Sequence, residues 1–483
     1  MELIEEFLTI EERFGLNEIQ INNQKFWNYC RFNIYSYLKT SKNGLLAAHE
    51  KLSVGKQIER YLKNTPFLLK QKIDDVMCKS QKTHQKILVL CHPRRIFVDG
   101  NMVSIYTDPI MDGIDNVVSY ETTDLYSHHR PCASQNMHYL DKAEVIARLK
   151  YVCDKFIFKG RYSKLYNTLN EKLYLPLNAL EECIDTEIDK ELIIHIAIKY
   201  YYLACEIEKY WKREFKRQQP SAVIEVVGYG LAAMTLNTVA HSYKCPVIEL
   251  QHGTINESHI GYHYLSTDGL DTLPDVFFTF GDYWNDQISM PGVDIVSMGF
   301  EYFLQERDRF IARYNKKNQI LFISQRNVGQ NLSRIAVKIS EACKGVDDVK
   351  IIYKLHPGEF AGAKELYPDL FKRNNIEIIT NEIPLYQLFA ESKVQIGFNS
   401  TALYEGIGFG LKTYFTNDAD GLIREMIASG IAELIDENVD EQDILKSLHD
   451  YCDNCIDESL VSKLWRFNAR ENVMNYLKEK DFV

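Results

Sequence analysis

Short apolar runs separated by amphipathic segments dominate the chain from residue 222 onward. The runs are four to six residues long, which suits strands buried on both faces of a parallel sheet. The first series is expected at 222–227, 246–250, 275–280 and 295–298. A second series is expected at 319–324, 349–354, 376–379, 394–398, 413–416 and 431–435. Helical segments between such strands predict an α/β fold with two doubly wound, Rossmann-like units.

The N-terminal part has a different pattern. Apolar and aromatic residues recur at helical spacing between residues 27 and 38, and we expect residues 1–75 to be mostly helical. The apolar run at 86–92 predicts one buried strand, and a long helical region is expected from about 140 to 217. These segments predict helical additions to the first unit.

The length of the chain also indicates more than one domain. Its 483 residues exceed what one hydrophobic core usually holds, and the two strand series separate near residues 300–318. We therefore predict an N-terminal domain over 1–300, a C-terminal domain over 301–455, and a final helix over 456–483 that packs back on the first domain.

Polar residues follow the expected strands in both halves. In open parallel sheets, ligands bind beyond the carboxyl ends of the strands, so binding residues are expected there. In the first half these positions carry His92, Arg94, Arg95, Asp99, Tyr229, Gln251, His252 and Gly253. A single polar residue at a strand end is often only a loop residue or a helix cap. Three histidines at strand ends, His92, His252 and His356, are harder to explain in that way.

In the second half, the strand ends predict a site for a nucleotide phosphate. Lys354 and His356 lie two residues apart, so both can direct a donor at one phosphate. Residues 399–401 open a helix, whose first N–H groups attract anions, and Glu405 can accept hydrogen bonds from ribose hydroxyls. The expected donor-binding residues are Gln325, Arg326, Lys354, His356, Pro357, Glu359, Asn399, Ser400, Thr401 and Glu405.

The first half offers a general base instead. Histidine, with an ordinary pKa of about 6.5, is suited to take a proton from an alcohol, and His252 lies between Gln251 and Gly253. Gly253 permits close backbone approach, and Gln251 can orient a hydroxyl. Glu225 and Glu249 either orient the imidazole or are paired strand carboxylates; the pattern leaves both open.

Composition and charge narrow the function and the compartment. The chain carries 56 Lys and Arg against 67 Asp and Glu, a net charge of −11, which argues against a protein that coats nucleic acid. Eleven cysteines without framework spacing, no visible secretory signal and no long apolar span lead us to expect a cytoplasmic protein. The Lys-rich stretch at 63–86 is either a solvated linker or a peripheral contact with the inner face of the cytoplasmic membrane.

Three motifs resemble those of bacterial capsule and surface-polysaccharide glycosyltransferases of the GT-B fold. Residues 247–254 (VIELQHGT) look like the Q-H-G segment of that family, and 354–357 (KLHP) like the His-Pro motif of sialyl-, polysialyl- and Kdo transferases and CDP-glycerol-type polymerases. Residues 398–401 (FNST) look like its Ser-Ser/Thr segment. The likeness extends over about 220–430.

The resemblance implies a GT-B-like fold of two facing Rossmann-like domains, with added N-terminal helices. It implies transfer of a sugar from a nucleotide-activated donor, such as CMP-Kdo or CMP-sialic acid, to a glycan or glycolipid acceptor of the cell surface. The acceptor would contact His92, Arg94, Arg95, Tyr229, Gln251 and Gly253.

Several assignments stay open within this resemblance. Val98-Asp99-Gly100 departs from the acidic-acidic-Gly segment that carries the base in CMP-sugar enzymes, which leaves His252, Asp99 and Glu225 as candidate bases. No metal or cofactor is expected. Three alternatives remain: a CDP-polyol phosphotransferase, a nucleotide-sugar epimerase, and a non-catalytic scaffold for glycan assembly.

Overall fold

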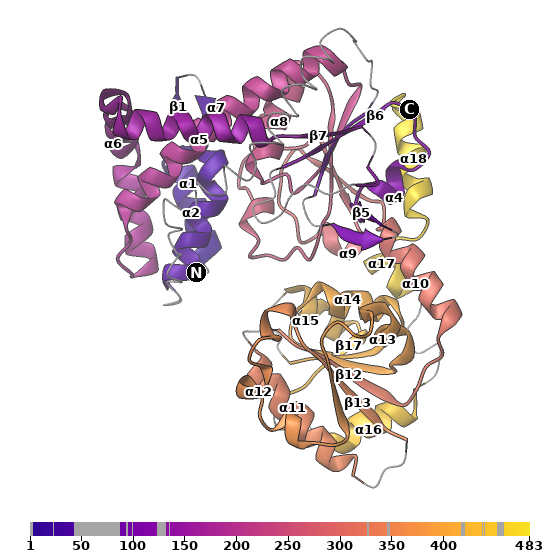
Figure 1. Ribbon diagram of the computed structural model, residues 1–483. Coiled ribbons are helices and arrows are strands. Elements are labelled where there is room, and N and C mark those ends of the chain that lie inside the picture. The colour runs from indigo at the N-terminus through magenta and orange to yellow at the C-terminus, as the bar shows by residue number, and fades with distance from the viewer. Residues whose placement is uncertain are drawn as a thin grey trace.

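Two parallel sheets form the cores of two domains, one above the other in Figure 1. The computed structural model describes residues 3–22, 24–42, 87–92, 95–98, 100–122, 132–134, 136–325, 328–344, 348–416, 421–436, 438, 440–451 and 458–483. The Lys-rich stretch at 63–86 and the end of the expected N-terminal helical region lie outside these residues.

The first domain is built on a sheet of seven strands within the described residues. In spatial order the strands are β11 (Asp294–Ser297), β10 (Val276–Thr279), β9 (Val247–Leu250), β8 (Ala222–Val226), β3 (Ile87–Cys91), β6 (Val117–Glu121) and β7 (Met137–Tyr139). All neighbours run parallel. The five strands from β10 to β6 are buried at every position, because helices cover both faces of the sheet.

The second domain is built on a six-stranded parallel sheet. Its strands, in spatial order, are β14 (Ile376–Ile379), β13 (Lys350–Lys354), β12 (Gln319–Ile323), β15 (Val394–Gly397), β16 (Lys412–Phe415) and β17 (Ala432–Leu434). The predicted α/β class with two doubly wound sheets is confirmed. Strands β6 and β7 were not anticipated, because they are short and mix polar with apolar residues.

A bundle of helices extends the first domain to the left in Figure 1. It contains α1 (Leu3–Arg13), α2 (Trp27–Lys42), α5 (Asp141–Phe156), α6 (Lys159–Ile184) and α7 (Lys190–Gln218), with a small hairpin of β1 (Gln20–Ile21) and β2 (Gln24–Lys25). The Asp189 side chain caps α7 by accepting from the Leu192 N–H at 2.8 Å. Phe7, Trp27 and Leu169 belong to a core of this bundle that is separate from the cores around the sheet.

The remaining helices cover the sheets or connect them. Those of the first domain are α4 (Asp108–Met111), α8 (Leu231–Ser242) and α9 (Asp282–Asn285), beside a hairpin of β4 (Ile96–Val98) and β5 (Asn101–Val103). Those of the second are α11 (Gly329–Ala342), α12 (Ala363–Leu366), α13 (Leu385–Glu391), α14 (Thr401–Gly408), α15 (Gly421–Ala428) and α16 (Glu441–His449). The connecting helices are α10 (Glu301–Arg313), α17 (Glu458–Leu464) and α18 (Ala469–Glu479).

The C-terminal segment joins the two domains. Helix α17 contacts α9 of the first domain and α14 of the second, and α18 contacts α4. Trp465 is fully buried at this junction, where its indole donates to the Tyr404 carbonyl at 2.9 Å. Trp284 donates in turn to the Leu464 carbonyl at 2.8 Å. Within the described part of the chain, no helix combines the length and apolar character needed to cross a bilayer.

Candidate active site

Each sheet has one point where the chain reverses the direction in which it adds strands. In the first sheet this point lies between β3 and β8, and in the second between β12 and β15. Ligands of doubly wound sheets bind in the crevice beyond the carboxyl ends of the strands at such a point. The loops after these strands and after the adjacent β9 and β13 carry most of the residues that the sequence analysis selected.

His252 is held between two tyrosines in the loop that follows β9. Its Nε2 lies 3.2 Å from the Tyr229 hydroxyl, and its Nδ1 lies 3.2 Å from the Tyr262 hydroxyl. Tyr106 donates to the His252 carbonyl at 2.5 Å, and the His92 ring stacks on the His252 ring with centroids 5.6 Å apart. The imidazole is therefore fixed on both sides while remaining half-buried.

The hydrogen bonds determine which nitrogen of His252 acts as an acceptor. Tyr262 donates its proton to Glu249 Oε1 at 2.8 Å, so its oxygen accepts from Nδ1–H of His252. Nε2 then carries the lone pair and accepts from the Tyr229 hydroxyl. A substrate hydroxyl that displaced this phenol would meet a basic nitrogen.

Two buried carboxyl groups lie behind this histidine. Glu225 and Glu249 are opposite each other on β8 and β9, and both are almost completely inaccessible to solvent. Burial raises the pKa of Glu249 to about 7, and burial together with Glu249 raises the pKa of Glu225 well above its ordinary value. Because Glu225 is fully buried, it cannot touch an acceptor hydroxyl, which corrects its assignment as a candidate base.

The turn after β8 is shaped to fit Glu249. Val227 adopts a φ of 67°, an unfavourable conformation for a β-branched residue, and the following Gly228 N–H donates to Glu249 Oε1 at 2.6 Å. A Cβ at position 228 would lie 2.1 Å from Glu249 Oε2, so any larger residue there would displace the Glu249 carboxyl.

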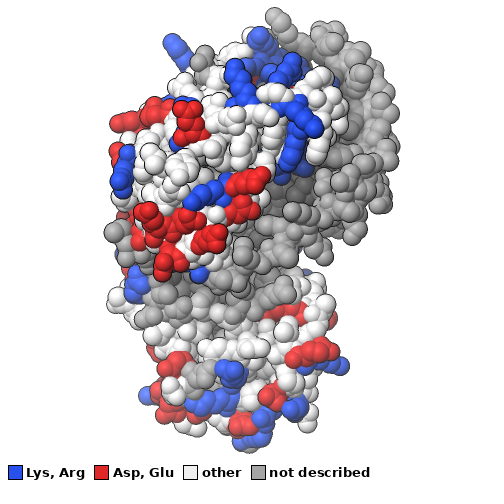
Figure 2. Space-filling model, turned by 90° about the vertical axis from the view of Figure 1, so that its left-hand side faces the viewer, with Lys and Arg blue, Asp and Glu red and all other residues white. Residues whose placement is uncertain are grey.

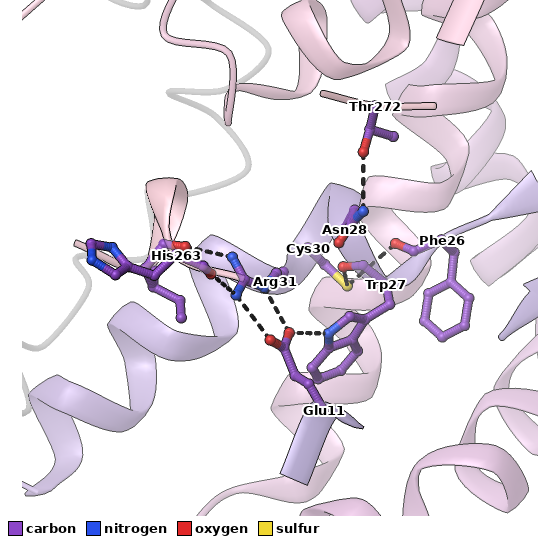
Figure 3. A network of polar contacts seen from close by, with 9 residues as sticks. Glu11, Phe26, Trp27, Asn28, Cys30, Arg31, His263 and Thr272 are labelled. Carbon is purple, nitrogen blue, oxygen red and sulfur yellow. Dashed lines mark hydrogen bonds and ion pairs between the residues drawn. The ribbon is translucent and has the colours of Figure 1, made fainter. Parts of the chain in front are cut away.

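The N-terminal helices support the loop that carries Tyr262 (Figure 3). Arg31 of α2 forms a bidentate ion pair with Glu11 of α1, with N–O distances of 2.7 and 2.9 Å, and both side chains are buried. The same guanidinium donates to the backbone carbonyls of Ile260 and His263, at 2.5 and 2.6 Å. These bonds hold the 3₁₀ turn Ile260–Tyr262 against the helical bundle, and neither Arg31 nor Glu11 was selected in the sequence analysis.

In the second domain, a chain of hydrogen bonds joins the loops after β12, β13 and β15. Gln325 donates to the Asn399 carbonyl at 2.6 Å and accepts from the Asn399 N–H. Ser324 donates to Glu359 at 2.9 Å. Ser400 caps α14 by accepting from the Ala402 N–H at 3.3 Å. The structure thus brings together the predicted residues Gln325, Glu359, Asn399, Ser400 and Thr401.

His356 lies exposed in the loop after β13. Its Nδ1 accepts from the Gly358 N–H at 3.1 Å, so in the neutral ring Nε2 carries the proton and can donate to a ligand. Glu359, which was expected to bind the donor, is buried and instead accepts from the His356 N–H at 2.7 Å and from Tyr367. It therefore positions the loop, since it has no accessible surface for a ligand.

The Lys354 side chain does not point toward the predicted phosphate site. Its ammonium group donates to the Thr380 carbonyl after β14, on the side of β13 away from the switch point. Burial lowers its pKa. The Lys354 amino group is therefore bonded at the β14 side of the sheet, away from Ser400 and Thr401.

The facing loops of the two domains come into contact. A Cβ on Gly253 would lie 3.9 Å from the Thr401 hydroxyl, so the Q-H-G loop meets the start of α14. Beside this point, Arg424 of α15 pairs with Glu257 at 3.2 Å. His252 and the start of α14 therefore lie on facing loops of the two domains, beyond the strand ends where doubly wound folds hold their ligand crevice.

The other predicted residues have varied environments. Gln251 is buried and uses both ends of its amide on the backbone of Gly253 and Phe280. Arg95 is an internal residue that pairs with Glu121 at 3.1 Å and approaches Asp108 at 3.8 Å. Both therefore maintain loops and are not placed to contact an acceptor. Glu405 accepts from Tyr386 at 3.0 Å, and Pro357 begins the 3₁₀ turn after His356.

Some predicted positions lie outside the described residues. These are Arg94, Asp99 and Arg326. Among the residues that the structure describes, no group of three or more His, Cys, Asp or Glu is arranged to hold a metal ion.

The sequence analysis missed the phenols that orient His252. Tyr229 was selected only as an acceptor contact, and Tyr106 and Tyr262 were not selected. A tyrosine after a strand carries no distinct signal, because its role depends on which other loop it meets.

Comparison with known proteins gives a fold assignment. No protein-family model matches the chain, and no curated protein matches it in sequence. Among solved structures, the UDP-GlcNAc 2-epimerase of Neisseria meningitidis bound to UDP-GlcNAc is 13% identical, with a TM-score of 0.50, over 82% of this chain and 100% of that one. The UDP-GlcNAc 2-epimerase of Methanocaldococcus jannaschii is 10% identical, with a TM-score of 0.49, over 82% of this chain and 99% of that one. MurG of Acinetobacter baumannii is 14% identical, with a TM-score of 0.38, over 58% of this chain and 79% of that one.

At identities this low, the likeness concerns the fold alone. The fold assignment rests on the Neisseria meningitidis structure, whose TM-score is 0.50. Two Rossmann-like parallel sheets and a C-terminal segment that joins both domains complete the description. The chain has the GT-B fold.

Proposed function

We propose that the protein transfers a sugar from a nucleotide-activated donor to a hydroxyl of a glycan or glycolipid acceptor. The observation that carries this proposal is the closeness of the facing loops: a Cβ on Gly253, next to His252, would lie 3.9 Å from the Thr401 hydroxyl at the start of α14. A base and an anion-binding helix start thus border one space. That pairing is what attack by an alcohol on a nucleotide-linked sugar requires.

In the proposed reaction, His252 Nε2 takes the proton of the acceptor hydroxyl as its oxygen bonds to the anomeric carbon. The bond between that carbon and the phosphate oxygen breaks, and the nucleotide leaves with the bonding electrons. Its charge is met by the N-terminus of α14, by the hydroxyls of Ser400 and Thr401, and by Nε2–H of His356. The Nδ1–H bond to Tyr262 keeps the base in the required tautomer.

The finer identity of the substrates rests on the motif resemblance. CMP-Kdo or CMP-sialic acid is the proposed donor, and a capsule, lipopolysaccharide or other surface glycan is the proposed acceptor. Transfer of a polyol phosphate from a CDP donor would use the same groups, with attack at phosphorus and a phosphodiester as the product.

A nucleotide-sugar epimerase is the second candidate, because the Neisseria meningitidis structure shares the fold at a TM-score of 0.50. Epimerisation would call for carboxylates in contact with the bound sugar. Glu225 and Glu249, the carboxyls adjoining His252, are 0% and 1% exposed, which favours transfer.

The proposal is tested first by ligand binding and then by product analysis. CMP, CDP, UDP and GDP at millimolar concentration are compared for their effect on the melting temperature, since a ligand of the folded state raises it by mass action. We expect one nucleotide to stabilise the wild-type protein and less so the Ser400→Ala/Thr401→Ala double variant. The matched control is Ser429→Ala at the end of α15. If no nucleotide raises the melting temperature, the proposed donor site is wrong.

The sugar nucleotide of the selected base is then incubated with and without an acceptor glycan. A new glycosidic bond supports transfer, and a phosphodiester supports the polyol-phosphate alternative. An epimerised sugar nucleotide formed without acceptor would replace the proposal by the second candidate. Nucleotide binding without any conversion would leave the scaffold alternative.

A further inference from the structure

A stripe of large apolar side chains lies exposed where α5 meets α6. On α5 the exposed residues recur at spacings of three, three and four, which places them on one face of the helix. Two more follow in the corner itself. The six residues and their exposed fractions are Ile146 (37%), Leu149 (57%), Val152 (47%), Phe156 (64%), Ile157 (68%) and Phe158 (56%). A contiguous exposed apolar surface of this kind usually marks a contact with a partner or a membrane.

The corner is an ordered part of the fold. The N–H groups of Ile157 and Phe158 both donate to the Cys153 carbonyl, at 2.8 and 2.9 Å, and close the end of α5. Beneath them, the Tyr151 and Tyr162 rings lie 5.9 Å apart, and the Lys155 ammonium is within 6 Å of both. The apolar side chains are therefore presented by a fixed scaffold.

Basic residues surround this stripe. Residues 142–164 include seven Lys and Arg but only two Asp and Glu, in a chain whose net charge is −11. The two acids have partners, since Glu144 pairs with Arg148 at 3.4 Å and Asp154 accepts from Tyr202 at 2.7 Å. Lys150, Lys159, Arg161 and Lys164 are exposed. Figure 2, which looks onto the helical end of the molecule, shows Lys and Arg concentrated toward its top, at the level of this corner in Figure 1.

We propose that the α5–α6 corner, residues 146–164, is a docking surface for a bilayer rich in anionic lipids. The apolar face of α5 and the Phe156–Phe158 corner would enter the boundary between head groups and acyl chains. Lysines and arginines beside them extend their charged ends to lipid phosphates while their alkyl stems lie along the apolar surface. A second copy of the chain fits this surface less well, because its basic rim would face an equally basic rim. The residues of this surface differ from those of the Lys-rich stretch at 63–86 in the sequence, and the inference does not depend on the proposed reaction.

Vesicle co-sedimentation tests the proposal. The full chain is mixed with vesicles of phosphatidylglycerol and phosphatidylethanolamine, and separately with vesicles of phosphatidylcholine alone, at low and at high salt. We expect binding to the anionic vesicles at least about tenfold stronger than to phosphatidylcholine, because each basic residue near an anionic surface contributes about fivefold. We expect this advantage to shrink in 1 M salt, where the screening length falls to about 3 Å.

Two variants separate the apolar and the charged contributions. Phe156→Ser/Ile157→Ser/Phe158→Ser is expected to weaken binding at least about tenfold at either salt concentration. Lys159→Glu/Lys164→Glu is expected to remove the preference for anionic vesicles. The matched controls lie on the second domain: Leu366→Ser/Phe371→Ser, where both residues are about 40% exposed, and Lys364→Glu/Lys372→Glu. All substituted side chains are exposed, and thermal melting checks that each variant folds.

Several outcomes would overturn the proposal. One is a wild-type protein that stays in the supernatant with anionic vesicles. Another is an equal loss of binding in the second-domain controls. Light scattering provides the third readout: if the serine variant converts a dimer to a monomer and leaves vesicle binding unchanged, the corner is a self-association surface.

Discussion

The two sides of the crevice are built in opposite ways. On the first domain, His252 lies between the hydroxyls of Tyr229 and Tyr262, above two carboxyls that solvent does not reach. On the second domain, His356 is exposed and Thr401 borders the crevice at a helix start. One side holds its functional group in a fixed tautomer, and the other offers donors near the surface. This difference suits the proposed roles, because a base must keep its orientation at every turnover and a nucleotide must enter and leave.

The support behind the two sides differs as well. The first side depends on buried charged groups, with the Arg31–Glu11 pair behind the Tyr262 loop and Glu249 behind Tyr262 itself. On the second side, Gln325 bonds to the backbone of Asn399, and the Ser324 hydroxyl donates to the buried acid Glu359. We therefore expect substitutions to destabilise the first side more than the second.

Arg31→Ala should give the largest loss of stability. It leaves Glu11 buried without its cationic partner, which costs about 3–5 kcal/mol, or a melting temperature lower by roughly 10 °C. The matched control is Arg309→Ala on α10, whose partner Glu306 is less enclosed and whose own side chain is 63% exposed. There we expect a change within about 1 kcal/mol. Equal shifts in calorimetry for both variants would contradict the view that buried charge supports the first side.

His252→Ala should give the largest loss of activity. Removal of a general base lowers a rate by about 10²–10⁴-fold, and the nucleotide Kd should stay unchanged because the base lies on the other side of the crevice. Initial rates of sugar transfer and nucleotide titration measure the two quantities. His449→Ala is the control, since this ring is 90% exposed at the end of α16. A nucleotide Kd that rises together with the loss of rate would contradict the proposal that the first domain carries the base and the second binds the nucleotide.

The architecture was predictable because parallel strands buried on both faces leave a plain signature. The runs at 246–250 and 319–324 correspond closely to β9 and β12, and their polar ends follow from the topology. The short strand β6 was missed because Val117–Glu121 contains a serine and a glutamate, and no apolar run marks it.

The site was predictable only in part, for a physical reason. The sequence indicates which residues lie at strand ends, but not the direction of their side chains. Lys354 and His356 were assigned to one phosphate, yet Lys354 reaches the Thr380 carbonyl. Glu359 was assigned to the donor and Glu225 was one of three candidate bases, although both are buried. Hydrogen bonds between separate loops decide these directions, and no local pattern records them.

Glu249→Gln tests the buried acid behind His252. Burial raises the folded-state pKa of Glu249 to about 7, so between its unfolded value of about 4.3 and pH 7 the folded protein binds more protons than the unfolded chain. The proton bound by Glu249 therefore stabilises the folded protein fully below about pH 4.3, and this stabilisation is lost as the pH rises through 7.

The glutamine keeps an acceptor for Tyr262 and Gly228 without the charge. We therefore expect the wild type to lose up to about 3 kcal/mol relative to the variant between pH 4.5 and 8. Urea denaturation across this range measures the difference. The control is Glu391→Gln, which replaces another buried acid, one that is paired with Lys317. Its free energy of unfolding should change between pH 4.5 and 8 as much as that of the wild type. An unchanged pH dependence in Glu249→Gln would mean that the carboxyl does not take up a proton on folding.

The smallest effects are expected on nucleotide binding, where the comparison of His356→Ala with Lys354→Met is the sharpest test of the second side. Loss of one hydrogen bond to a charged phosphate costs about 1.5 kcal/mol, about tenfold in nucleotide Kd. Lys354→Met should change that Kd less than about threefold, because the ammonium is engaged with Thr380. Isothermal titration of the nucleotide against both variants measures this. If Lys354→Met weakened binding and His356→Ala did not, the phosphate would lie toward β14, and the start of α14 would lose its proposed role.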